Sequence, residues 1–181
     1  MVLVLAILAT ACGGDEHPPA PSADASANLQ VRRVENVVIR SSPEWDATEL
    51  TCPGEDAGAC LAATGAESVV VMDADEVKYL LGPVVVDGGD VEEAKAYEDP
   101  VNEGWTVSTP LSPEGSEALA SATRGAVRAL PPKDHIAIVA DGLVVSGPTV
   151  AQPVTAGIMI VSVGLSQAEA ERLASRLNGG D

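Results

Sequence analysis

The sequence is poor in aromatic and basic side chains. It contains no phenylalanine, and its only aromatic residues are Trp45, Trp105, Tyr79 and Tyr97. A hydrophobic core must therefore be built largely from Ala, Val and Leu, and Val-rich segments favour strands because branched side chains pack well on a pleated sheet. Ten Lys and Arg stand against 27 Asp and Glu, a formal net charge of −17. So acidic a chain, without a basic cluster, repels phosphate backbones, and nucleic acid is not an expected partner.

Long apolar runs are also missing. No run reaches the length of about 18 residues that indicates a membrane-spanning helix. Residues 1–11 (MVLVLAILATA) are apolar but too short to cross a bilayer, and they fit the apolar region of a signal peptide. Ala9, Thr10 and Ala11 precede Cys12, and small residues before a Cys resemble the lipobox of bacterial lipoproteins. We therefore expect a lipoprotein signal peptide over residues 1–11 and lipidation of Cys12.

Two departures from the lipobox leave an alternative open. Ala9 stands where Leu is commoner, and no Lys or Arg precedes the apolar run. The alternative is an ordinary secretory signal followed by an incidental Cys. A lipid with two or more acyl chains at Cys12 would hold the protein stably at a membrane. The Pro-, Ser- and Ala-rich segment that follows cannot bury a core, so residues 12–29 are expected to form a disordered tether.

Cys52 and Cys60 remain as an even pair in a chain expected to be exported. Pro53, Gly54 and Gly58 allow the segment between them to turn back on itself. This pattern predicts a structural disulfide, which would stabilise the fold by roughly 2–3 kcal/mol on the chain-entropy model. A redox-active pair and a metal clip are the alternatives, although the first usually has CxxC spacing and the second needs further ligands.

Apolar patterning after the tether predicts a domain over residues 30–181 with alternating strands and helices. The predicted strands cover residues 30–40, 68–72, 84–86, 105–109, 135–140, 143–146 and 157–163. Asp141-Gly142 between two apolar runs predicts a tight hairpin. The expected fold class is α+β, with a mixed or antiparallel sheet and helices packed on one face.

Three helices are predicted from their capping residues. Asp90 followed by Glu93 has capping-box spacing and predicts a helix to about Tyr97. Ser112 with Pro113 in the first turn predicts a second helix that ends before Pro131. Residues 166–169 (SQAE) form another capping box and open a last helix with apolar residues at helical spacing.

Several short segments in this order resemble the extracytoplasmic head of the protein-export factor SecD. They are Tyr79–Pro83 with Gly88 and Val91, Trp105–Val107 with Leu111 and Gly115, Ala137–Pro148, and Gly157 with residues 162–164 and 168–174. The third is similar to the family pattern A-I-V-L-D-G-x-V-I-S-x-P. The residues that carry the motif are Gly82, Pro83, Trp105, Asp141, Gly142, Ser146 and Pro148.

The resemblance implies a small α+β head domain outside the cytoplasm. In SecD this region is thought to engage polypeptide emerging from the translocon, so Sec translocon components or exported polypeptides are the implied partners. SecD continues into six membrane-spanning helices that couple proton flow to movement, and this sequence contains no such segments. We expect a lipid-anchored binding protein without the motor; the alternative is an envelope lipoprotein that reuses the fold for an unrelated binding or structural role.

No pattern indicates catalysis. The sequence has no G-x-S-x-G elbow, phosphate loop or dinucleotide fingerprint. His135 is the only candidate base outside the tether, and a surface or half-buried His is the simpler interpretation. The acidic groups at residues 73–76 and 87–90 lack the spacing of a calcium loop and fit solvated turns. We expect a protein that is not an enzyme and that needs neither cofactor nor metal.

Overall fold

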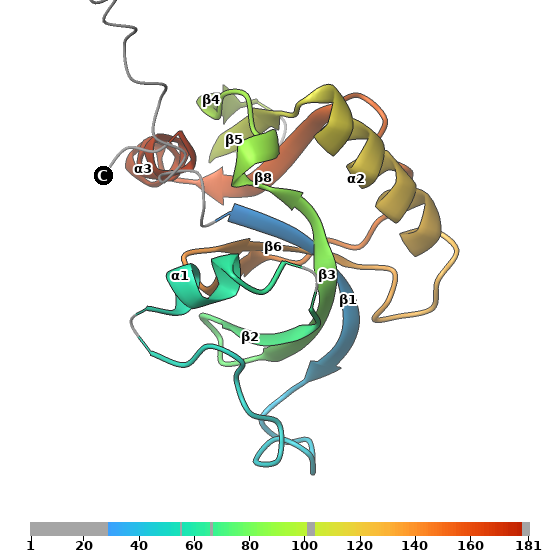
Figure 1. Cartoon of the computed structure of the whole chain (residues 1–181). Helices are drawn as coiled ribbons and strands as arrows, with labels where there is room; N and C mark the ends of the chain where they lie inside the picture. Colours follow the sequence, from blue (N-terminus) through green and yellow to red (C-terminus); the bar gives the residue numbers. More distant parts are fainter. Residues whose placement is uncertain (1–28, 55, 66, 101–103, 179–181) are drawn as a thin grey trace, which may run out of the picture.

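The computed structural model describes residues 29–54, 56–65, 67–100 and 104–178 (Figure 1). The elements are β1 (Leu29–Val38), α1 (Ala57–Ala62), β2 (Val69–Asp73), β3 (Lys78–Asp87), η1 (Gly88–Asp90), β4 (Lys95–Asp99), β5 (Gly104–Pro110), α2 (Pro113–Ala126), β6 (Ile136–Ala140), β7 (Leu143–Ser146), β8 (Ile158–Leu165) and α3 (Gln167–Leu177). The predicted α+β class is confirmed. The first strand begins at Leu29, one residue before the predicted domain boundary.

The strands are divided between two sheets rather than gathered in one. Five of them close a barrel in the order β1-β3-β2-β7-β6, and β4-β5-β8 form a three-stranded sheet. The pairings are antiparallel except between β2 and β7, where only Met72↔Leu143 and Asp73↔Val144 pair in parallel. The α3 helix packs against the three-stranded sheet, and α2 contacts β3 at the other side of the molecule (Figure 1).

Two groups of small aliphatic side chains form the core, as the lack of phenylalanine requires. The barrel interior includes Val34, Val69, Val71, Leu81, Val139 and Val144. The second group lies between the three-stranded sheet, the helices and the barrel wall, and includes Val31, Val86, Val107, Ile138, Val161, Ala170 and Leu173. Strand β6 faces both groups, since Ile138 belongs to one and Val139 to the other. Its five residues are therefore all buried.

The caps predicted for the last two helices are confirmed. The Ser112 hydroxyl accepts from the Gly115 backbone N–H at 3.0 Å at the start of α2. At the start of α3, Ser166 and Glu169 form the reciprocal capping box, in which each side chain accepts from the other's backbone N–H. These local bonds satisfy backbone donors that a helix start otherwise leaves unpaired.

The helix predicted from Asp90 to Tyr97 is wrong. A capping box does form there, but Asp87 is the capping residue and Asp90 takes the third helical position, so the turn is the single 3₁₀ turn η1. The chain then extends into β4, which pairs along its whole length with β5. Ala96 packs against the second core group from this strand. Long-range pairing with β5 therefore overrides the local helix signal.

Gly82 and Pro83 lie inside β3 and form a bulge. Arg32 pairs with Val84 and Val34 pairs with Leu81, so two residues of β3 stand opposite the single residue between them on β1. A bulge suits Pro83, which has no N–H to give to the ladder. The Gly82 carbonyl accepts a hydrogen bond of 2.8 Å from Nη1 of Arg32.

Arg32 is completely buried and holds the connection between α1 and β2 against the barrel. Its Nη1 also donates to the Glu67 carbonyl at 2.8 Å, and its Nη2 donates to the Thr64 carbonyl at 3.1 Å. Its Nε donates to Oε1 of Gln30 at 2.8 Å. Burial lowers the pKa of Arg32 from its ordinary value. The guanidinium thus links β1, the connection between α1 and β2, and β3 through neutral acceptors.

The turn between β2 and β3 is organised by Asp73. Its carboxylate accepts from the backbone N–H groups of Asp75 and Val77, both at 2.9 Å, and from the Tyr79 hydroxyl at 3.1 Å. Burial, the hydrogen bond to Asp73 and the negative charges of Asp73 and Asp75 raise the pKa of Tyr79 to about 12.

We expect stability to depend on pH through Tyr79. Its folded pKa is above the ordinary value of 10.0, so its contribution to stability is complete below about pH 10 and is lost as the pH rises to about 12. Denaturant melts between about pH 10 and pH 12 measure this loss of stability. Tyrosinate absorbance, recorded in parallel, reports the ionisation of Tyr79. Tyr79→Phe should remove the tyrosinate absorbance change above about pH 11 and weaken the dependence of stability on pH. The same absorbance change in the variant as in the parent protein would contradict the raised pKa of Tyr79.

Candidate functional site

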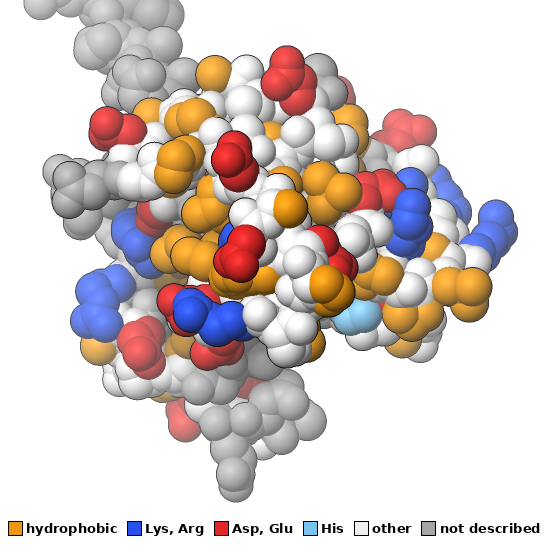
Figure 2. All heavy atoms as spheres, turned by 90° about the horizontal axis from the view of Figure 1, so that it is seen from below, with side chains coloured by type: hydrophobic (Ala, Val, Ile, Leu, Met, Phe, Trp, Pro, Cys, Tyr) orange, Lys and Arg blue, Asp and Glu red, His pale blue; other side chains and the backbone are white. Residues whose placement is uncertain are grey.

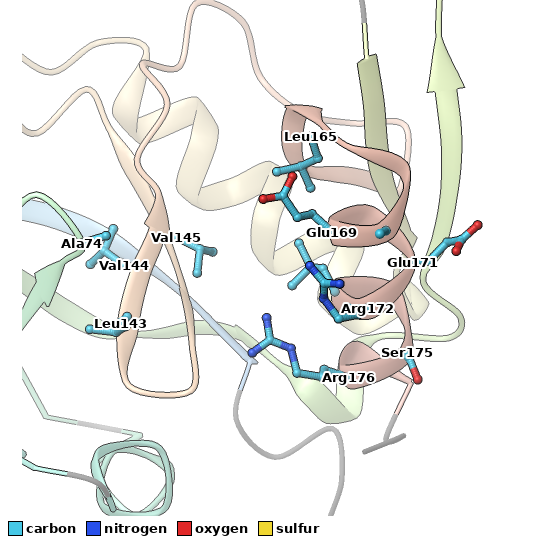
Figure 3. A pocket seen from close by; sticks show the side chains of 12 residues that line it. Ala74, Leu143, Val144, Val145, Leu165, Glu169, Glu171, Arg172, Ser175 and Arg176 are labelled. Carbon is cyan, nitrogen blue, oxygen red and sulfur yellow. The ribbon is translucent and has the colours of Figure 1, made fainter.

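An open cleft of about 880 Å³ lies between β7 and α3 (Figure 3). Leu143 and Val145 line it from β7 and remain 45% and 40% exposed, because they alternate with Val144, which is buried in the barrel. Leu165 at the end of β8 and Ala168 near the start of α3 complete its apolar lining. Such walls favour uncharged side chains of a ligand.

The α3 side of the cleft carries charge. Figure 3 shows Glu169, Arg172 and Arg176 pointing from the helix toward the β6–β7 hairpin, whereas Glu171 and Ser175 point away from it. Arg172 and Arg176 are both exposed and stand one helical turn apart. The cleft thus combines an apolar floor with two guanidinium groups on one rim.

Glu169 is ionised at neutral pH and is committed to its own helix. Hydrogen bonds from the Ser166 hydroxyl and backbone N–H, and then the nearby charge of Arg172, lower the pKa of Glu169. The capping box holds this carboxylate. The guanidinium groups of Arg172 and Arg176 are therefore the side chains of the rim best placed to contact an acidic group of a ligand.

Asp141 and Gly142 form the tip of the β6–β7 hairpin, as the sequence predicts, next to Leu143, which lines the cleft. Both residues have positive φ, 51° and 83°, which the tight turn requires. The Asp141 carboxylate accepts from Nη1 of Arg176 at 2.7 Å. This ion pair ties the hairpin tip to the last turn of α3 and sets the width of the cleft at that end.

The hairpin tip also packs directly against the disulfide loop. The predicted disulfide between Cys52 and Cys60 is formed, and α1 begins within the loop that it closes. A Cβ atom on Gly142 would lie 2.9 Å from the backbone carbonyl carbon of Ala57 and from the Gly58 nitrogen. Only a residue without a side chain fits here. The β6–β7 hairpin, the end of α3 and the disulfide loop therefore meet at the hairpin tip.

A second, smaller cavity of about 370 Å³ lies among α2, β6, β8 and the loop after β7. Leu119, Ile138, Pro148 and Met159 are typical of its lining, and none of its lining residues is charged. It is separate from the cleft. It carries no group positioned for proton transfer or metal binding.

His135 lies at the start of the β6–β7 pair. Its Nδ1 is 2.7 Å from Oδ1 of Asp134, and its Nε2 is 3.0 Å from the Thr149 hydroxyl. His135 and Thr149 also form a backbone bridge. The contacts with Thr149 hold the two segments together at the open end of the hairpin, and His135 is half-buried there.

Charge is spread over the surface of the domain. On the face in Figure 2, acidic and basic side chains are interspersed with hydrophobic ones, and neither sign covers the face. Among the described residues, no three His, Cys, Asp or Glu side chains gather closely enough to hold a metal ion. In the same part of the chain, every helix is too short or too polar to cross a membrane.

Comparison with known protein families shows which family the chain belongs to. The model of the SecDF P1 head subdomain matches residues 67–181, more than half of the chain. The chain belongs to this family. The predicted resemblance to the SecD head is thereby confirmed, and the matched region includes the hairpin, both walls of the cleft and α3.

Two relatives of this SecDF P1 head chain are much longer proteins. It is 39% identical over 104 residues to the protein translocase subunit SecD of Streptomyces coelicolor, covering 57% of the chain and 18% of that relative. It resembles the crystal structure of SecDF in its super-membrane-facing form with a TM-score of 0.54 and 22% identity, covering 87% of the chain and 19% of SecDF. The chain therefore spans less than a fifth of either protein, and the structural likeness establishes the fold.

The P1 head motif residues do not converge on one site. Asp141 and Gly142 form the hairpin tip beside the cleft, whereas Ser146 and Pro148 line the smaller cavity. Gly82 and Pro83 form the bulge in β3, and Trp105 lies in β5 and packs against the core. Most of the motif thus specifies the fold. Cys12, the signal peptide over 1–11 and nearly all of the tether lie outside the described residues.

Sequence reasoning did not identify Arg172 and Arg176 as residues of the site. They lie on the last helix, whose apolar spacing predicts the buried face but gives no information on what its polar face meets. The signal available was weak: two of only ten basic residues stand four apart on one helix. Arg32 was also missed, because a single Arg in a strand sequence looks like an exposed residue.

Proposed function

We propose that this P1 head chain acts outside the cytoplasm as a binding protein that assists protein export by contacting translocating polypeptide or Sec components. The observation that carries the proposal is the cleft between β7 and α3, where exposed Leu143 and Val145 face a helix with two guanidinium groups. Family membership supports an export-related role, since the SecD relative is a translocase subunit.

The cleft has the chemistry expected of a site for varied polypeptides. Its apolar walls accept aliphatic and aromatic side chains, and its rim offers donors to carboxylates and backbone carbonyls. It lacks the deep enclosure that would select one small molecule. Binding without catalysis is part of the proposal, and the structural contacts of His135 support it.

We also propose that Cys12 carries a lipid after removal of residues 1–11, so that residues 13–28 connect the domain to a bacterial membrane. The run of small residues before Cys12 supports this. Metabolic labelling with a palmitate analogue should mark the protein, and Cys12→Ser should abolish the label and release the protein from the membrane fraction. Persistent labelling of that variant would contradict the anchor.

Site-specific photocrosslinking in cells tests the binding role. A photoreactive residue at Val145 should capture secreted precursors or Sec subunits, identified by mass spectrometry. Leu130 is the matched control, because it is 83% exposed and apolar but lies beyond α2, outside the cleft. Capture should be several-fold stronger from Val145 than from Leu130.

Double replacement of Leu143 and Val145 by Ser should reduce capture by a probe placed at Leu165 while leaving the fold intact, because both side chains are substantially exposed. Capture that is equal from Val145 and Leu130, or that yields one unrelated envelope protein, would contradict the export role. The latter result would support reuse of the fold for another binding task.

A further inference from the structure

The chain enters the domain beside the cleft. Leu29 pairs with Ala140 on β6, and Ala140 pairs with Leu143 on β7. Two strand spacings amount to about 10 Å, so the residue before Leu29 starts about that far from the lining residue Leu143. Any segment directly before Leu29 is therefore held at a high local concentration near the cleft.

The segment before Leu29, residues 13–28, differs in composition from the rest of the chain. It reads GGDEHPPAPSADASAN, with three carboxylates and no Lys or Arg. Pro18, Pro19 and Pro21 favour an extended conformation with about 3.1 Å per residue. The segment thus offers a negative charge at Asp24 followed, further from the domain, by a short apolar proline run.

The cleft presents complementary groups in the same order. Arg176 and Leu143 lie at its end next to the hairpin tip, as Figure 3 shows. Arg172 follows one turn, about 6 Å, further along α3, and Leu165 lies at the far end. Asp24 is four residues from residue 28, a reach of up to about 13 Å. Pro21 would then lie up to about 9 Å beyond Asp24, and residues 18–21 would span about a further 9 Å.

We propose that residues 13–28 fold back into the cleft between β7 and α3, with Asp24 paired to Arg172 and Arg176 and the run 18–21 lying against Val145 and Leu165. This inference rests on the proposed function and states how polypeptide binding in the cleft is regulated. The segment occupies the cleft when no polypeptide is present and competes with polypeptide when it arrives.

Tethering offsets the weak affinity of the segment for the cleft. Exposed ion pairs and a short proline run bind weakly on their own, but a linker of this length gives an effective concentration in the millimolar range. A polypeptide that covers more of the apolar wall therefore displaces the segment. The lipid-anchored form would then expose its cleft only where exported chains are abundant.

Intramolecular photocrosslinking of the full, membrane-bound chain tests this. A photoreactive residue at Val145 should form adducts within the same molecule that map to residues 13–28, and the same probe at Leu130 should not. Asp24→Lys should lower the intramolecular yield about two- to fivefold, the range that loss of an exposed ion pair produces. Arg172→Glu together with Asp24→Lys should restore it. Asp46→Lys, the same charge change on an exposed loop, is the matched control.

Equal intramolecular yields from Val145 and Leu130, or a yield unaffected by Asp24→Lys, would overturn the inference. Polypeptide capture is scored separately in the same gels, since it increases the mass of the adduct. Loss of capture with retained intramolecular adducts would contradict the proposed function alone. Release of the segment by Asp24→Lys should raise capture at Val145.

Discussion

Replacement of Arg32 by Met is expected to lower the free energy of unfolding by about 3–5 kcal/mol. The guanidinium is fully buried and donates to the carbonyls of Thr64, Glu67 and Gly82 and to the Gln30 side chain. Met has a similar length but no donor. The Gly82 carbonyl and the Gln30 side chain would therefore lose their partner in the buried interior, and the Thr64 and Glu67 carbonyls would lose theirs at part-buried positions. Each buried acceptor without a partner costs about 1–3 kcal/mol.

Equilibrium denaturant melts measure this change. Arg40→Met is the matched control, because the Arg40 side chain is 66% exposed and forms a surface ion pair with Glu76 and a cation–π contact with Trp45. The control should change stability by no more than about 1 kcal/mol. Similar losses for the two variants would show that the buried network around Arg32 does not stabilise the fold. Hydrogen exchange should also increase first at residues 62–68, the connection that Arg32 holds.

Gly142→Ala is expected to destabilise the protein by about 2–5 kcal/mol. The residue has a φ of 83°, which costs a residue with a side chain about 1–2 kcal/mol. The new methyl group would also lie 2.9 Å from backbone atoms of Ala57 and Gly58, and such overpacking adds about 1–3 kcal/mol. Thermal or denaturant melts give the value.

Gly65→Ala separates this effect from a general response to added methyl groups. A Cβ atom at Gly65 meets nothing within 4 Å, so this variant should stay within about 0.5 kcal/mol of the parent. Because Gly142 packs on the disulfide loop, Gly142→Ala should also shift the hairpin relative to α3 and reduce crosslinking from Val145. Unchanged stability and crosslinking would contradict the tight packing of the tip.

Local signals in the sequence predicted a large part of the fold. Asp141-Gly142 specified the hairpin because few residues adopt positive φ. Ser112 and Ser166 specified the starts of α2 and α3 because their side chains satisfy nearby backbone donors. The Cys52–Cys60 bond also followed from residues close in sequence. Each of these features depends on interactions within about ten residues.

Features that depend on distant residues were not predicted. The strand β4 replaces a predicted helix because β5 supplies its backbone partners, and the closure of the barrel depends on two residue pairs between β2 and β7. The charged side of the cleft required Arg172 and Arg176 to be brought opposite Leu143, more than twenty residues earlier in the chain. Periodicity indicates which face of an element is buried but does not identify its neighbour.

The meeting of three segments at the hairpin tip has a consequence for how this unit is built into larger proteins. Leu29 enters beside Ala140, and Arg176 at the end of the last helix is held by Asp141. The two ends of the domain thus emerge at one corner. A unit with this geometry can be inserted between two parts of a host protein that remain neighbours. The same corner that borders the cleft is therefore where flanking segments of a host protein would join this unit.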